Sequence, residues 1–173
     1  MNRGRTDLQT AVFETTWGSL SIAAGARGVA ACRLPAAPGT PRPLQVLRVR
    51  IPRGAKAVLR QAVDFVRAVI EGRAPGKCPA LDEAALGGAP EFRRSVWTAL
   101  RKIPRGRTLT YSGLAGLAGH PRAARAAGSA CGANPLPLFI PCHRAVAANG
   151  DLGGFSAGLA WKTRLLTGEG AWR

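Results

Sequence analysis

The chain has 173 residues, 46% of them hydrophobic, which suffices for one ordinary domain or two small ones and excludes wholesale disorder. No apolar run of about 18 residues occurs and the N-terminus lacks a secretory h-region, so we expect a soluble cytoplasmic protein without a membrane-spanning helix. Lysine and arginine outnumber acidic residues by 25 to 9, and the net charge of +16 favours a nucleic-acid partner over a merely solvated basic surface or an anionic membrane.

Short strands and one helix are predicted in the first half of the chain. The strands are expected at residues 11–17, 20–25 and 28–35, separated by glycine-containing turns. Residues 35–45 are rich in proline and predict a loop. Residues 57–72 predict a helix, because apolar residues recur with helical period and Gly72 lies where a helix would end. This half is therefore expected to be an α/β unit.

The second half changes character. Residues 72–90 show little pattern, and we place a domain boundary near residue 87. The predicted domains are 1–87 and 88–173. A helix is expected over residues 90–104, where Pro104 would end it.

Two further helices and a hairpin are predicted beyond it. Thr110 suits the N-cap of one helix, and Pro121 suits the first position of the next. Two short helices joined by a glycine-containing turn are typical of a helix-turn-helix. Asn149 and Gly150 then predict a hairpin turn, and residues 155–170 predict a last helix. A helix-turn-helix followed by a hairpin is a winged-helix-like arrangement, which suits DNA.

Cys142 lies directly before His143, at the end of an apolar run. The four cysteines form no CxxC pair and the chain has only two histidines, so we expect neither a metal site nor another cofactor. A thiol attacks as the thiolate, and an imidazole nearby is the usual group that removes its proton. The alternative is that Cys142 is a core thiol and His143 a structural imidazole.

A resemblance to a known family covers essentially all of residues 91–170. The segment "IPCHRAV" together with "GGFSAGLAWKTRLLTGEG" is similar to the signature region of the O6-alkylguanine-DNA alkyltransferases, also called methylated-DNA–protein-cysteine methyltransferases. Residues 10–85 match only loosely. The resemblance implies an α/β N-terminal domain, ribonuclease-H-like, followed by a mainly helical, winged-helix-like DNA-binding domain that carries Cys142.

The resemblance also implies a role for each site residue. Cys142 would be the nucleophile, His143 would deprotonate it through a water molecule, and Glu169 would orient His143. Asn134 would support the hydrogen bonding near the thiol, and Tyr111 would donate to the base. Residues implied to contact the substrate or the DNA are Arg125, Ala123, Ala124, Gly128, Arg144, Ala145, Phe155 and Ser156.

Within that set, the resemblance distinguishes three kinds of contact. Arg125 would enter the space left by a flipped nucleotide, while the small side chains around it let the helix approach the minor groove. The carbonyls of Cys142 and Ala145 and the amide of Ser156 would read the guanine edge, and Phe155 would wall the pocket. The family often has Val and Tyr where this chain has Ala145 and Phe155.

The implied function is DNA repair by irreversible, stoichiometric alkyl transfer. The substrate would be O6-alkylguanine, or O4-alkylthymine, in double-stranded DNA, and the protein would act as a monomer associated with the nucleoid. Two alternatives stay open. One is a damage sensor that binds alkylated DNA without reacting, and the other is a helix-turn-helix regulator with an incidental thiol.

Overall fold

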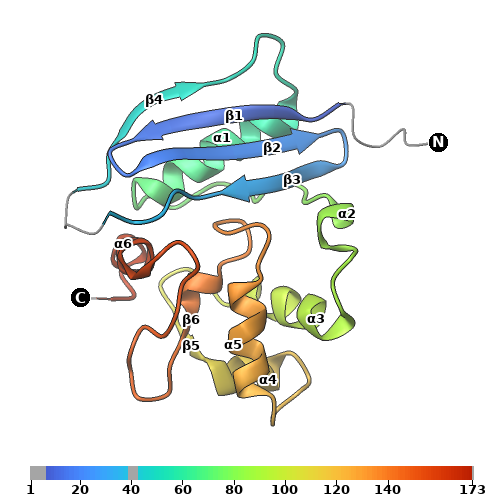
Figure 1. Cartoon of the computed structure of the whole chain (residues 1–173), viewed down its shortest axis with the longest axis vertical. Coiled ribbons are helices and arrows are strands. Elements are labelled where there is room, and N and C mark those ends of the chain that lie inside the picture. The colour runs from blue at the N-terminus through green and yellow to red at the C-terminus, as the bar shows by residue number, and fades with distance from the viewer. Residues whose placement is uncertain (1–6, 39–42, 173) are drawn as a thin grey trace.

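The computed structural model describes residues 7–38 and 43–172. Its first half is a four-stranded antiparallel sheet with strand order β3-β2-β1-β4. The strands are β1 (Gln9–Thr15), β2 (Gly18–Gly25), β3 (Gly28–Arg33) and β4 (Val46–Arg50). Helix α1 (Ala57–Ile70) packs against one face of this sheet, as Figure 1 shows. The mixed α/β class is confirmed, while the ribonuclease-H-like description stays a prediction.

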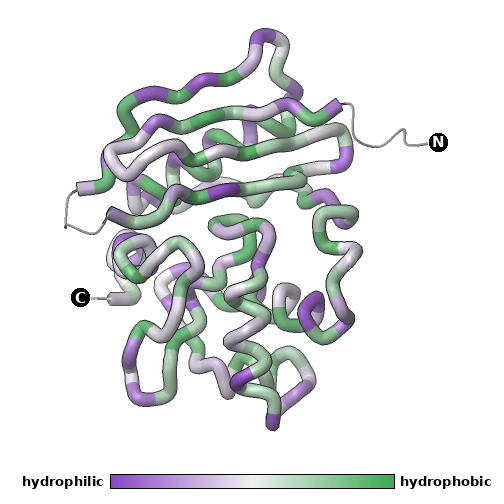
Figure 2. Tube along the Cα trace, viewed as in Figure 1, coloured by the Kyte–Doolittle hydropathy of each residue, from purple (hydrophilic) through white to green (hydrophobic). Residues whose placement is uncertain are grey.

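The strands and helix form where the sequence has matching periodicity. In β1 and β2 alternate residues are buried, so that Phe13, Leu20 and Ile22 face the core. The predicted face of α1 is buried, and Gly72, with a φ of 75°, follows its C-cap. Strand β4 was not predicted, because arginines interrupt its apolar residues and prolines precede it. Figure 2 shows this mixture of hydrophilic and hydrophobic residues along the edge strand.

The second half is mainly helical. Its elements are α2 (Glu83–Leu86), α3 (Glu91–Leu100), β5 (Leu109–Thr110), α4 (Tyr111–Leu117), α5 (Ala124–Gly132), the 3₁₀ helix η1 (Cys142–Arg144), β6 (Ala145–Val146) and α6 (Leu159–Glu169). Helices α3, α4 and α5 pack on one another. The Thr110 hydroxyl accepts a hydrogen bond from the Gly113 amide at 3.1 Å, which confirms the predicted N-cap of α4.

Two details of the predicted helix-turn-helix and wing are wrong. Helix α5 begins at Ala124 rather than at Pro121, which lies in the preceding turn. Asn149 and Gly150 do form a turn, closed by a bond from the Ala147 amide to the Asp151 carbonyl, but no antiparallel ladder continues from it in the described chain. Strand β6 instead pairs in parallel with β5. The antiparallel ladder is missing because the Leu152 and Gly154 carbonyls accept hydrogen bonds from a lysine of α6 and not from a strand.

The two halves share one continuous hydrophobic core. Phe65 stacks on Phe139 with 5.4 Å between ring centroids, and Trp17 meets Trp161 edge-on at 5.1 Å. The Trp161 indole also donates to the Pro35 carbonyl at 2.9 Å. Phe65 lies on α1, while Trp17 lies in the β1–β2 turn and Pro35 follows β3. These contacts therefore hold the segment before Cys142 against α1, and α6 against the end of the sheet. The boundary near residue 87 stays a prediction. Among the described helices, none has the length and apolar character needed to cross a membrane.

Candidate active site around Cys142

Cys142 follows a tightly turned, buried segment. Leu138 has a φ of 75°, a conformation that costs a non-glycine residue free energy and is tolerated where surrounding packing enforces it. The turn buries Phe139 and Ile140 in the core. The Cys142 amide donates to the Ile140 carbonyl at 2.8 Å, which closes a γ-turn around Pro141, and the Arg144 amide then donates to the Pro141 carbonyl at 3.0 Å in the 3₁₀ turn. The core therefore fixes the backbone that carries the thiol.

Asn134 links this backbone to the thiol itself. Its amide nitrogen donates to the Ile140 carbonyl at 2.8 Å and lies 3.1 Å from Cys142 Sγ, while its oxygen accepts from the Leu136 amide at 3.0 Å. Donation to sulfur favours the thiolate over the thiol. The predicted support of the thiol by Asn134 is thus present in the geometry.

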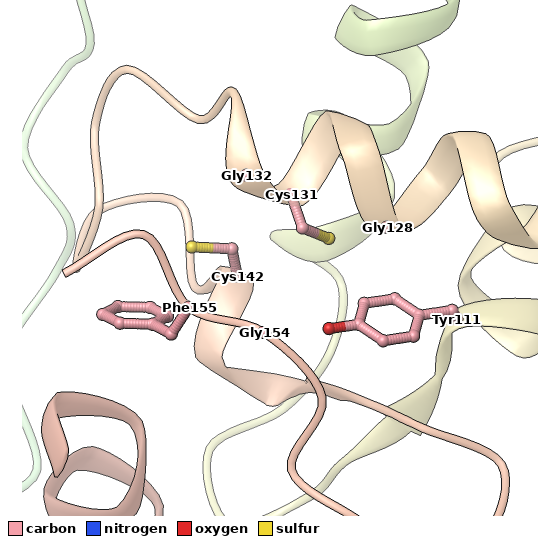
Figure 3. A pocket seen from close by; sticks show the side chains of 7 residues that line it. All are labelled: Tyr111, Gly128, Cys131, Gly132, Cys142, Gly154 and Phe155. Atoms are coloured by element: carbon pink, nitrogen blue, oxygen red, sulfur yellow. The ribbon is translucent and has the colours of Figure 1, made fainter. Parts of the chain in front are cut away.

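The thiol opens into a cavity of about 280 Å³. Figure 3 shows Cys142 between Phe155 on one side and Cys131 and Tyr111 on the other, with the tyrosine hydroxyl directed toward the segment at Gly154. The lining residues are Tyr111, Gly128, Cys131, Gly132, Cys142, Gly154 and Phe155. This volume lies just under the range of roughly 300–1,000 Å³ that is usual for small-molecule sites. The cavity has the size for a single small planar group.

His143, Glu169 and Arg144 form a connected, largely buried network. His143 Nε2 lies 3.0 Å from a Glu169 oxygen, and its other ring nitrogen, Nδ1, is buried without a hydrogen-bond partner in the described protein. Arg144 donates to both Glu169 oxygens and also to the Ile103 carbonyl at 2.7 Å. Glu169 also accepts from the Gly106 amide at 3.3 Å. The carboxylate thus fixes the imidazole ring and leaves Nδ1 as the nitrogen that is available to take a proton.

The resting protonation states follow from burial and these contacts. Burial raises the pKa of the Cys142 thiol, although Asn134 and Lys162 oppose this shift. Burial lowers the pKa of His143 below its usual range, against the effect of Glu169. Burial acts to raise the pKa of Glu169, but hydrogen bonds from His143 and Arg144 outweigh it and bring that pKa to about 2. At neutral pH the site therefore holds a thiol, a neutral imidazole and a carboxylate.

The structure places the residues expected to contact DNA in different settings. Arg125 is exposed in the first turn of α5, with Ala123 and Ala124 half-buried beside it. Gly128 faces the Tyr111 ring, where an added Cβ would lie 3.8 Å from it. Ser156 is exposed next to the cavity-lining Phe155.

Arg144 and Ala145 both make contacts inside the protein, and their DNA and guanine contacts stay predictions. The Arg144 guanidinium is directed inward onto Glu169 and is only 15% exposed, so its DNA-contact prediction gains no support. Ala145 is fully buried, and its carbonyl accepts from Lys162 at 2.5 Å. Sequence reasoning missed Lys162, although its position within the quoted signature segment was a signal that could have been followed.

A metal ion has no evident ligand set here. Across residues 7–38 and 43–172, no group of three or more His, Cys, Asp or Glu side chains is arranged to hold one.

The comparisons with known proteins agree with this site. Residues 91–171 match the family described as "6-O-methylguanine DNA methyltransferase, DNA binding domain". Methylated-DNA–protein-cysteine methyltransferase of Salmonella typhimurium is 50% identical over 88 residues, which are 51% of this chain and 51% of that protein. The protein of the same name from Methanosarcina mazei is 42% identical over 106 residues, 60% of this chain and 67% of its own length. In the first alignment this chain spans about half of the curated relative's length.

A solved structure extends the likeness to nearly the whole chain. The crystal structure of Mycobacterium tuberculosis OGT in complex with DNA superposes with a TM-score of 0.69 and 29% identity, covering 92% of this chain and 91% of that one. The matches by sequence and by fold therefore point to the same class of proteins. The chain belongs to the methylated-DNA–protein-cysteine methyltransferase family.

Proposed function

We propose that this protein repairs DNA by moving the alkyl group from O6 of guanine, or from O4 of thymine, to its own Cys142. The observation that carries the proposal is the opening of the Cys142 thiol into a cavity that Tyr111 and Phe155 line. His143, the next residue in the chain, is held by Glu169. The names of the relatives, which specify methylated DNA and a protein cysteine, support the same chemistry.

The reaction is a single displacement. The Cys142 proton passes to His143 Nδ1 through a bridging water, and the thiolate attacks the alkyl carbon. A sulfur–carbon bond forms while the carbon–oxygen bond breaks, and the base leaves with the electron pair and takes up a proton. Tyr111 donates a hydrogen bond to the departing base. The product thioether has no partner that would cleave it, so each molecule reacts once.

The substrate is double-stranded DNA with the damaged nucleotide flipped out, since O6 of a stacked base cannot reach a thiol inside a cavity. A monomer binds through the minor groove, using the small residues of α5 and the exposed Arg125. The net charge of +16 supports contacts to phosphates, and the related M. tuberculosis OGT was crystallised with DNA.

The test is to incubate the protein with duplex DNA that carries one isotopically labelled O6-methylguanine. Mass spectrometry is expected to find one methyl group per protein molecule, on the peptide that contains Cys142. Label on Cys131, turnover beyond one event, or binding to the lesion without any label on protein would contradict the proposal. The last outcome would favour a damage sensor.

Arg125→Ala is expected to impair repair of duplex DNA by about 10- to 100-fold, because flipping a nucleotide costs a few kcal/mol and the side chain would offset part of that cost. Reaction with free O6-benzylguanine, which needs no flipping, is expected to change less than about twofold. The measurement is single-turnover transfer with both substrates. Arg53→Ala, which removes an equal charge from an exposed turn of the other half, is the matched control.

Equal losses of Arg125→Ala with both substrates would mean that Arg125 supports the fold or the thiol rather than the flipped state. A loss of the same size in Arg53→Ala would mean that only the net charge matters.

A further inference from the structure

Lys162, in α6, is a fully buried lysine. Its ammonium donates to the Ala145 carbonyl at 2.5 Å, to the Leu152 carbonyl and, at 3.3 Å, to the Gly154 carbonyl. Three acceptors match the three N–H bonds of an ammonium, whereas a neutral amine has only two. The surroundings therefore select the charged form, although burial lowers the pKa of Lys162. Lysine is among the residue types least often fully buried, so this placement calls for a physical reason.

The three carbonyls belong to two segments that meet at the cavity. Ala145 begins β6, directly after the η1 turn that carries Cys142, while Leu152 and Gly154 belong to the loop that passes the cavity. Gly153, between them, has a φ of 69° and lies so close to Tyr111 that an added Cβ would come within 2.7 Å of the hydroxyl. Lys162 also lies over the Tyr111 ring, 5.7 Å from its centroid. The Lys162 ammonium thus links the loop at residues 152–154, which forms one wall of the cavity, to β6, which follows Cys142 in the chain.

The positive charge of Lys162 affects the Cys142 thiol, because the other titratable groups that interact with this thiol are neutral. The titratable groups that interact with Cys142 are Tyr111 on α4, Cys131 on α5, Cys32 on β3 and Lys162 on α6. Burial is the first cause that raises the pKa of the tyrosine and of both cysteines, to about 12 for Cys131, so all three are neutral at pH 7. His143, next to Cys142 in η1, is neutral as well, and its partner Glu169 is balanced by Arg144. Among these groups that interact electrostatically with the thiol, Lys162 is the one that carries a charge at pH 7.

We propose that Lys162 is a positioning residue that holds the cavity wall in place and supplies the fixed positive charge that stabilises the Cys142 thiolate. The inference rests on the proposed alkyl transfer for the choice of nucleophile. It adds a step which the His143–Glu169 pair does not perform: His143 accepts the proton, while Lys162 stabilises the charge left on sulfur. A cation that three carbonyls hold in a buried site needs no reorganisation as that charge develops.

The test uses two substitutions that separate donation from charge. Lys162→Gln keeps N–H donors without the charge, and Lys162→Met removes both. The readout is the rate of Cys142 alkylation by iodoacetamide against pH, which requires neither DNA nor alkylguanine and so remains informative if the proposed function fails. Lys77→Met, at an exposed lysine, is the matched control.

Both variants are expected to move the midpoint of the rate–pH curve upward by at least about one pH unit, because the thiolate loses its stabilising charge. The rate at pH 7 falls less than the tenfold loss of thiolate, to roughly a third, since a more basic thiolate is a better nucleophile. Lys162→Met is additionally expected to increase amide exchange of residues 152–154. Folded variants with the wild-type midpoint would overturn the proposal and leave Lys162 a purely structural residue.

A reciprocal measurement covers the case in which the Lys162 variants do not fold. If the two charges interact, removing the thiol must change the lysine by the same free energy. In Cys142→Ala, nitrogen NMR of Lys162 is therefore expected to show deprotonation at a pH about one unit lower than in the wild type. An unchanged lysine titration would overturn the proposal.

Discussion

Replacing Cys142 by alanine is expected to abolish alkyl transfer completely, while binding to alkylated duplex DNA stays within about twofold of wild type. The sulfur is the atom that forms the new bond, so no other group restores the reaction. Asn134 keeps its bonds to the Ile140 carbonyl and the Leu136 amide, so the fold is expected to lose only about 1 kcal/mol. Radiolabel transfer, DNA binding by fluorescence anisotropy and urea denaturation measure the three quantities.

Cys131→Ala is the matched control, because this thiol lines the same cavity. Burial and the neighbouring Cys142 raise the pKa of Cys131 to about 12, so it stays protonated and unreactive at pH 7. The control is expected to retain transfer at close to the wild-type rate. Residual transfer by Cys142→Ala would show that another residue can act as the nucleophile. Complete loss of transfer in Cys131→Ala would likewise contradict the assignment of Cys142.

The parts of the fold that sequence reasoning predicted are those with a local cause. The apolar periodicity of residues 57–70 predicts helix α1, and the capping residue Thr110 predicts the start of α4. Cys142 and His143 are adjacent in the chain, so their presence in one site needed no knowledge of the tertiary structure. The resemblance then supplied Asn134, Tyr111 and Glu169, which the fold does bring to the thiol, the cavity and the imidazole.

The parts that sequence reasoning missed depend on partners far apart in the chain. Arg144 looks like a basic residue for DNA until Glu169, 25 residues later, is seen to accept its hydrogen bonds. Lys162 looks like the polar side of a surface helix, and its ammonium finds acceptors only because Ala145 and the loop at 152–154 come together around it. The same return explains the missing hairpin, because carbonyls that bond to Lys162 are not free to form a ladder.

Glu169→Gln is expected to slow alkyl transfer by about 100-fold or more at every pH from 6 to 8. The carboxylate holds the His143 ring and stabilises the imidazolium that forms when the thiol proton arrives; loss of such an orienting carboxylate elsewhere costs a factor of about 10⁴. DNA affinity is expected to change little, since the side chain is only 7% exposed. Glu91→Gln, at an exposed position at the start of α3, is the matched control.

Glu169→Gln is also expected to shift the pH dependence of the alkyl-transfer rate in one direction. Glu169 raises the pKa of His143, opposing the larger effect of burial, so removing it lowers that pKa further. The acid limb of the rate profile is therefore expected to move to lower pH in Glu169→Gln, even as the plateau falls. Single-turnover reaction with free O6-benzylguanine from pH 5 to 9 measures both. A wild-type plateau in this variant would remove Glu169 from the proton path, and a wild-type rate in His143→Ala as well would remove the imidazole.

The free energy of unfolding is also expected to depend on pH through Glu169. The pKa of Glu169 falls from 4.5 to about 2 on folding, so the pair with His143 and Arg144 stabilises the protein above about pH 4.5, and this contribution is lost as the pH drops toward 2. The shift corresponds to roughly 3 kcal/mol for this buried carboxylate. Glu169→Gln also leaves Arg144 unpaired, so its free energy of unfolding at pH 7 is expected to fall by about 3–5 kcal/mol. Urea denaturation at pH 7 and pH 3 tests this: the difference between variant and wild type should shrink at the lower pH, and a constant difference would show that the carboxylate is not paired in solution.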